Sequence, residues 1–125
     1  MTAIVIVAHR GVGESLCQQA EVIVGRRLKL GLISVCEQAD PDVALADLGR
    51  LLEAVTDPAN TLILTDLPGA TPHNLALKAA AARALPVVSG LNLPMLLKAI
   101  NHADKPASEL AILADLGGHQ GIVQQ

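Results

Sequence analysis

The stretch that decides the fold is Ala3-Ile4-Val5-Ile6-Val7-Ala8-His9. Its first six residues are apolar without a break, which is typical of a strand buried on both faces of a parallel sheet. The run then ends on a histidine. Ligands and reactive groups of open α/β sheets collect at the carboxyl ends of the strands, so we expect His9 to be a functional residue.

The rest of the chain alternates between strand-like and helical patterns. Further strands are predicted at residues 30–35, 62–66 and 87–89, and helices at 16–24, 41–55, 72–84, 92–100 and 106–118. This order predicts one α/β domain over residues 1–125, with an open, mostly parallel sheet in the order 2-1-3-4 and helices on both faces. Residues 121–123 are expected to add a short antiparallel edge strand.

The composition argues against several classes of partner. Phe, Tyr and Trp are absent and the formal net charge is −3, so the chain offers neither aromatic stacking nor a basic surface to a nucleic acid. No apolar run is long enough to be inserted in a membrane. Cys17 and Cys36 form no CxxC pair, which is typical of free thiols in a reducing compartment. We therefore expect a cytoplasmic protein.

Asp66 is the expected partner of His9. It ends the strand predicted at residues 62–66, which neighbours the first strand in the order 2-1-3-4. A carboxylate that accepts the proton of one imidazole nitrogen orients the ring and leaves the other nitrogen free to act as a base or nucleophile. The alternative is a histidine that caps the sheet and bonds locally.

The segment after Asp66 has features of an anion site. Gly69 allows close backbone approach, and the helix that Pro72 opens has unpaired first-turn amides and a dipole that favours anions. We expect Gly69, Ala70 and Thr71 to bind a phosphate, with Thr71 as the helix N-cap. The alternative is an ordinary strand-to-helix turn. The glycines at 11 and 13 lack the lysine of a P-loop, so no nucleotide cofactor is predicted.

The chain resembles the mannose-family enzyme IIA of the bacterial phosphoenolpyruvate-dependent sugar phosphotransferase system. The resemblance rests on three blocks: Ile4-Val5-Ile6-Val7-Ala8-His9 with Gly13-Glu14-Ser15-Leu16 and Ala20-Glu21, then Thr65-Asp66-Leu67-Pro68-Gly69-Ala70-Thr71-Pro72-His73-Asn74, and Val88-Ser89-Gly90-Leu91-Asn92-Leu93-Pro94-Met95-Leu96. It implies that His9 accepts a phosphoryl group from the phosphocarrier HPr and passes it to a IIB component. It also implies that Asp66 orients His9, that Thr71 belongs to a phosphate-binding turn, and that the protein is a homodimer with a C-terminal strand packed across its partner. Neither a cofactor nor a metal is implied.

Three residues depart from the family pattern. Arg10 stands where the family commonly has glycine, and Pro68 and His73 replace aromatic residues. We assign all three to partner binding, although Arg10 could instead contact the phosphoryl group. Two other functions stay open. One is a regulatory sensor read out through its phosphorylation state. The other is a metal-dependent small-ligand protein that uses His9, Asp66 and His73 as ligands.

Overall fold

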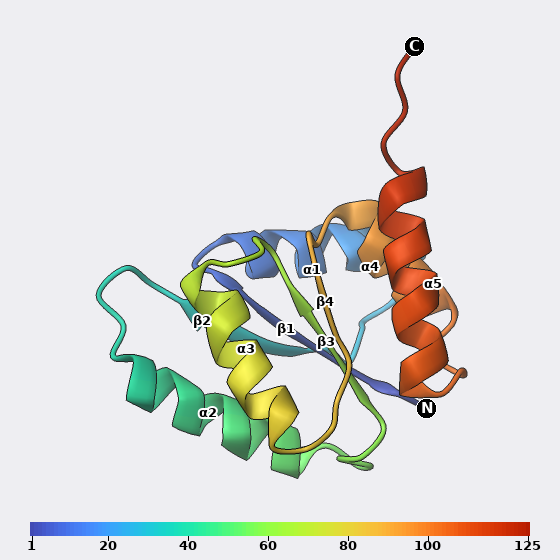
Figure 1. The fold of residues 1–125 in the computed structure, drawn as a ribbon. Coiled ribbons are helices and arrows are strands. Elements are labelled where there is room, and N and C mark those ends of the chain that lie inside the picture. Colours follow the sequence, from blue (N-terminus) through green and yellow to red (C-terminus); the bar gives the residue numbers. More distant parts are fainter.

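Four parallel strands form the centre of the molecule in the order β2-β1-β3-β4 (Figure 1). The structure is a computed structural model that describes residues 1–125. The strands are β1 (Ala3–His9), β2 (Gly31–Val35), β3 (Thr61–Thr65) and β4 (Val87–Ser89). The predicted strand order is confirmed. Val7 pairs with Thr65 across β1 and β3, so the carboxyl ends of these two strands meet at one edge of the sheet.

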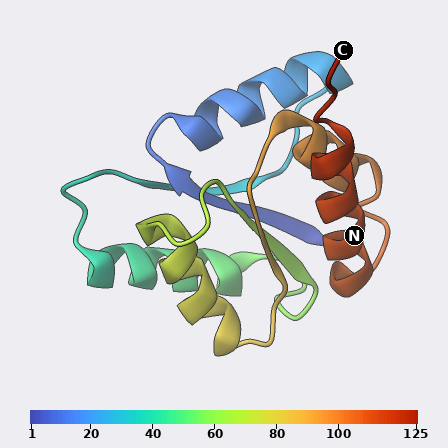
Figure 2. The ribbon, with the colours of Figure 1, turned by 45° about the horizontal axis from the view of Figure 1, so that its top comes forward.

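Five helices connect and cover the strands. They are α1 (Val12–Val24), α2 (Pro41–Ala54), α3 (Thr71–Ala81), α4 (Leu93–Asn101) and α5 (Ala107–Gln120). Helices α1, α4 and α5 lie on one face of the sheet, and α2 and α3 lie on the other (Figures 1 and 2). The helices on both faces explain why β1 before His9 and the centre of β3 are continuously apolar.

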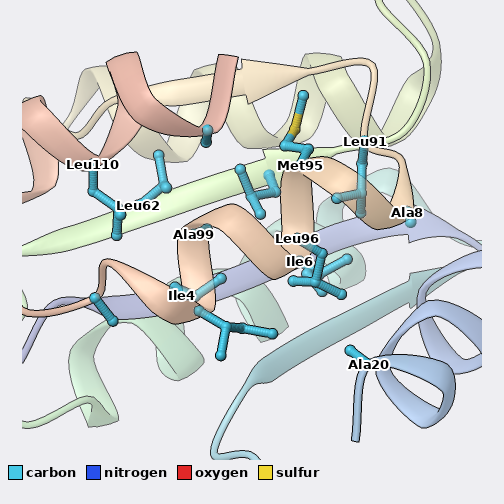
Figure 3. Packing of buried hydrophobic residues seen from close by; sticks show 14 residues of the cluster. Ile4, Ile6, Ala8, Ala20, Leu62, Leu91, Met95, Leu96, Ala99 and Leu110 are labelled. Atoms are coloured by element: carbon cyan, nitrogen blue, oxygen red, sulfur yellow. The ribbon is translucent and has the colours of Figure 1, made fainter. Parts of the chain in front are cut away.

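Alternate residues of β1 belong to two aliphatic cores. Ile4 and Ile6 belong to the core under α4 and α5, which also contains Leu96 of α4 (Figure 3). Val5 and Val7 belong to the core on the side of α2 and α3. The alternation follows from the side-chain period of two in a strand. Aliphatic side chains, joined by Met95 in the core beneath α4 and α5, fill both cores without any aromatic ring.

The ends of several helices follow the capping signals of the sequence. The Asp40 carboxylate accepts the Asp42 amide at 2.9 Å and begins α2, as predicted. Gly25, in the left-handed region at φ +81°, ends α1 as predicted. Asn92 begins α4, where its Oδ1 accepts the Met95 amide at 2.9 Å and its Nδ2 donates to the Gly118 carbonyl at 3.1 Å.

The C-terminal segment differs from the prediction. Helix α5 continues through Gly117 and Gly118 to Gln120, and the chain forms no fifth strand at residues 121–123. The glycines stay helical because they let α5 approach α4 closely: a Cβ on Gly117 would lie 2.5 Å from Lys98 Cβ. The last five residues are exposed and extend away from the helices (Figure 1). No helix combines the length and the apolar character that crossing a bilayer requires.

Candidate functional site

His9 and Asp66 meet at the carboxyl edge of the sheet. His9 is the last residue of β1 and Asp66 directly follows β3, its neighbour. The ring Nδ1 of His9 lies 2.7 Å from Asp66 Oδ2, and the backbone N–H of His9 donates to the same oxygen at 3.0 Å. The carboxylate thus holds both the ring and the backbone of the histidine. The strand order brings together the two residues that the sequence singled out.

Asp66 is arranged to remain ionised. Its side chain is only 10% exposed, and burial alone would raise the pKa of the carboxyl. The hydrogen bonds from the His9 backbone and ring outweigh this effect, and the Leu67 N–H adds a third bond to Oδ1 at 3.0 Å. Together they lower the pKa of Asp66 below its usual value.

The pairing determines which nitrogen of His9 is left without a partner in Asp66. In neutral imidazole only one nitrogen carries a proton, and Nδ1–H is the donor that a carboxylate selects. The lone pair is then on Nε2. Since 44% of the His9 side chain is exposed, a reacting group from another molecule can reach the ring. This geometry suits an oriented nucleophile whose positive charge, once formed, faces a carboxylate.

The turn that follows Asp66 carries the predicted phosphate-binding residues. Gly69 has φ +84°, in the left-handed region that glycine tolerates. Its N–H donates to His73 Nδ1 at 3.0 Å, and the Ala70 N–H donates to the Leu67 carbonyl at 3.2 Å. Two of the predicted amides are thus hydrogen-bonded inside the protein.

Thr71 is not the N-cap of α3, as the sequence had suggested. The N-cap is Ala70, whose backbone is extended (φ −80°, ψ 170°) and whose carbonyl accepts the Asn74 amide at 3.0 Å. Thr71 is the first helical residue and is exposed. Its position follows from Pro72, which fits the first turn of a helix because it has no N–H. The Thr71 amide is among the donors that a helix leaves unpaired.

An open cavity of about 330 Å³ adjoins His9 on the side of β2. It is lined by His9, Arg10, Val35, Cys36, Glu37 and Gln38. Residues 36–38 were not predicted to lie near the site. Their position directly after β2, which neighbours β1, was the signal that could have found them. Arg10 and Pro68 are both exposed.

The metal-site hypothesis does not fit this geometry. It requires His9, Asp66 and His73 to converge, but His73 Nδ1 is occupied by the Gly69 amide. No group of three His, Cys, Asp or Glu side chains in the chain is arranged to hold a metal ion. His9 and Asp66 therefore form a pair without a third ligand.

The chain is similar to known components of the phosphotransferase system. The EIIA-man family model, described as "PTS system fructose IIA component", matches residues 3–116. The mannose-specific EIIAB component of Escherichia coli K12 is 28% identical over 123 residues, which cover 96% of this chain and 38% of that protein. This chain thus spans less than two-fifths of the length of that curated relative.

Solved structures show the same relationship. A mannose/sorbose-specific IIA subunit from Enterococcus faecalis has a TM-score of 0.90 and 28% identity, covering 99% of this chain and 94% of its own. A phosphotransferase system component EIIA from Streptococcus agalactiae has a TM-score of 0.89 and 27% identity, covering 99% and 97%. These matches confirm the resemblance that the three sequence blocks indicate. The chain belongs to the EIIA-man family of the phosphotransferase system.

Proposed function

We propose that this chain is a phosphocarrier of the sugar phosphotransferase system, in which His9 accepts a phosphoryl group from phospho-HPr and passes it to a IIB component. The observation that carries the proposal is the 2.7 Å contact between His9 Nδ1 and Asp66 Oδ2 in a chain of this family. Membership of the EIIA-man family supports transfer from phospho-HPr to a IIB component. The contact with Asp66 supports His9 as the residue that carries the phosphoryl group.

The transfer uses the free nitrogen of His9. The Nε2 lone pair attacks the phosphorus of the donor's phosphohistidine in line, a new N–P bond forms, and the donor imidazole leaves with the electron pair of the old bond. The His9 ring keeps its Nδ1 proton and becomes positively charged. The ionised Asp66 stabilises that charge, and a second transfer to the IIB component restores the neutral ring.

We propose that the turn at the start of α3 binds the phosphoryl oxygens. Thr71 supplies its hydroxyl and an unpaired amide, and the helix dipole favours the anion. Gly69 and Ala70 contribute their amides by exchanging their internal acceptors, His73 Nδ1 and the Leu67 carbonyl, for phosphoryl oxygens.

Partner recognition is assigned to the residues that depart from the family pattern. Arg10 and Pro68 are exposed, and His73 is half-buried at the first turn of α3. We propose that they face HPr or the IIB component. Residues 1–125 act as one IIA domain in the cytoplasm, as a homodimer in which the exposed C-terminal segment packs on the partner.

The proposal is tested by phosphorylating the protein with labelled phosphoenolpyruvate, enzyme I and HPr. Wild-type protein should acquire an acid-labile, alkali-stable adduct, and His9→Ala should acquire none. His102→Ala, which removes a half-buried imidazole outside the site, is the control and should be labelled like wild type. Label on His9→Ala at the wild-type level would refute the role of His9.

A further inference from the structure

Side chains of α3 hold both polar groups of Gly69. The Gly69 N–H donates to His73 Nδ1 at 3.0 Å, and Asn74 Nδ2 donates to the Gly69 carbonyl at 3.3 Å. Because Nδ1 accepts, the proton of the neutral His73 ring lies on Nε2. This arrangement is local: His73 is the third residue of α3, and its side chain reaches back past the N-cap.

The same amide belongs to the turn in which the phosphoryl group is expected. Gly69 is exposed and has open space around the position of a Cβ, so a group from outside can approach its peptide. An N–H group can donate a full hydrogen bond to only one acceptor. The ring nitrogen of His73 and a phosphoryl oxygen therefore compete for it.

We propose that His73 accepts the hydrogen bond of the Gly69 backbone amide in the unphosphorylated protein, and that a phosphoryl group on His9 accepts it after transfer. His73 thereby sets the equilibrium constant for phosphotransfer to His9. The inference rests on the proposed function and adds a residue that regulates the same site. His73 acts through Gly69 and is thus a positioning residue.

The hydrogen bond between His73 and Gly69 affects the unphosphorylated and the phosphorylated protein differently. The His73 bond to Gly69 stabilises the unphosphorylated state only, since in the phosphorylated state the amide has moved to a phosphoryl oxygen. Without the His73 acceptor, the Gly69 amide donates to water instead. The substitution therefore destabilises the unphosphorylated state alone. A hydrogen bond of the usual net strength, about 1 kcal/mol, corresponds to a change of about fivefold in the equilibrium constant.

The first test measures the equilibrium between phospho-HPr and this protein. His73→Phe should shift that equilibrium about fivefold toward phosphorylated His9. His73→Gln offers an acceptor oxygen that can reach back from the same helix position, and its equilibrium should stay within about twofold of wild type. The equilibrium constant, unlike the rate, is independent of any contact between His73 and HPr in the complex. An unchanged or reversed equilibrium in His73→Phe would overturn the inference, as would an equal shift in His73→Gln.

The second test needs no variant. Nitrogen-15 NMR of wild-type protein should show His73 Nδ1 as a hydrogen-bonded acceptor before phosphorylation and as a solvent-exposed one afterwards, with a matching shift of the Gly69 amide. If His9 is phosphorylated and both signals stay in place, the inference fails while the proposed function stands. If wild-type protein accepts no phosphoryl group at all, it is the proposed function that fails.

Discussion

At the scale of the residue, the geometry of the candidate site depends on one carboxylate that accepts three hydrogen bonds. Asp66 receives the backbone and ring protons of His9 and the backbone proton of Leu67. The ring bond fixes the tautomer of His9, and the two backbone bonds fix the carboxylate itself. In the proposed mechanism, the reactivity of His9 is therefore a property of the pair.

Replacing Asp66 by Asn should slow phosphorylation by phospho-HPr about 10- to 150-fold. This change in rate corresponds to the 1.5–3 kcal/mol that a hydrogen bond to a charged group contributes. The bond in question joins Asp66 to the positively charged ring of His9. Initial rates of transfer measure the effect, and Asp104→Asn, at an exposed position outside the site, is the control. A wild-type rate in Asp66→Asn would show that the carboxylate has no part in the transfer.

Asp66 should also give stability a pH dependence. Its pKa is lower in the folded protein than in the unfolded chain, so the ionised form stabilises the fold above the unfolded pKa. That stabilisation is lost as the pH falls below about 4, through the folded pKa. We expect urea unfolding to show a gap in stability between wild type and Asp66→Asn that narrows on acidification. A gap that is constant from pH 7 to pH 3 would contradict this assignment.

At the scale of the element, the turn from β3 to α3 shows how backbone conformation shapes the site. Gly69 has φ +84° and nothing within 4 Å of its Cβ position, so alanine there would suffer backbone strain without a clash. Gly49 lies inside α2, where the nearest atom to an added Cβ is the flexible Arg83 Nη2 at 3.3 Å. The same substitution at the two positions should therefore have opposite effects.

Gly69→Ala should lower the free energy of unfolding by about 1–2 kcal/mol, the cost of a left-handed backbone for an L-residue. Gly49→Ala should raise it by about 0.5–1 kcal/mol, since alanine is the better helix former. Urea denaturation of both variants checks the pair. Changes of the same sign would mean that one of the two backbone conformations is wrong.

The elements show what sequence reasoning can reach. The extent of β1 and the caps at Asp40 and Gly25 follow from local patterns, and the encounter of His9 with Asp66 follows from the strand order. The N-cap at Ala70 does not follow from a local pattern, because Thr71 and Ala70 could both adopt the dihedral angles of a cap.

Packing between helices accounts for the difference at the end of α5. Helix α5 runs through Gly117 and Gly118 because close packing against α4 outweighs the low helix propensity of glycine. The hydrogen bond from Gly69 to His73 depends on the left-handed conformation of Gly69, which the sequence permits without requiring. The sequence therefore predicts that His9 and Asp66 meet, and the structure adds the interactions of the turn beside them.

At the scale of the whole molecule, the two aliphatic cores leave an apolar pair near the C-terminus without cover. Ile122 and Val123 are 77% and 68% exposed beyond the end of α5. Strand β4 lies at one edge of the sheet and is only three residues long. A sheet edge without a strand partner and an uncovered apolar pair fit the proposal that two copies of the chain associate.

Light scattering coupled to size-exclusion chromatography should give the mass of a dimer for wild type. Placing aspartate at both Ile122 and Val123 should shift the mass toward that of a single chain, because each charge would be buried at the interface. Val43→Asp, at an exposed position on α2, is the control and should remain dimeric. A monomeric wild type, or a dimeric double variant, would contradict the assembly.

The most direct test of the central claim identifies the atom to which phosphorus is bound. Protein labelled with nitrogen-15 in its histidines is phosphorylated by HPr, and the coupling between phosphorus and nitrogen is measured by NMR. Because Asp66 holds Nδ1, we predict phosphorus on Nε2 of His9, with Nδ1 still protonated. Phosphorus on Nδ1 of His9, or on any other residue, would contradict the account.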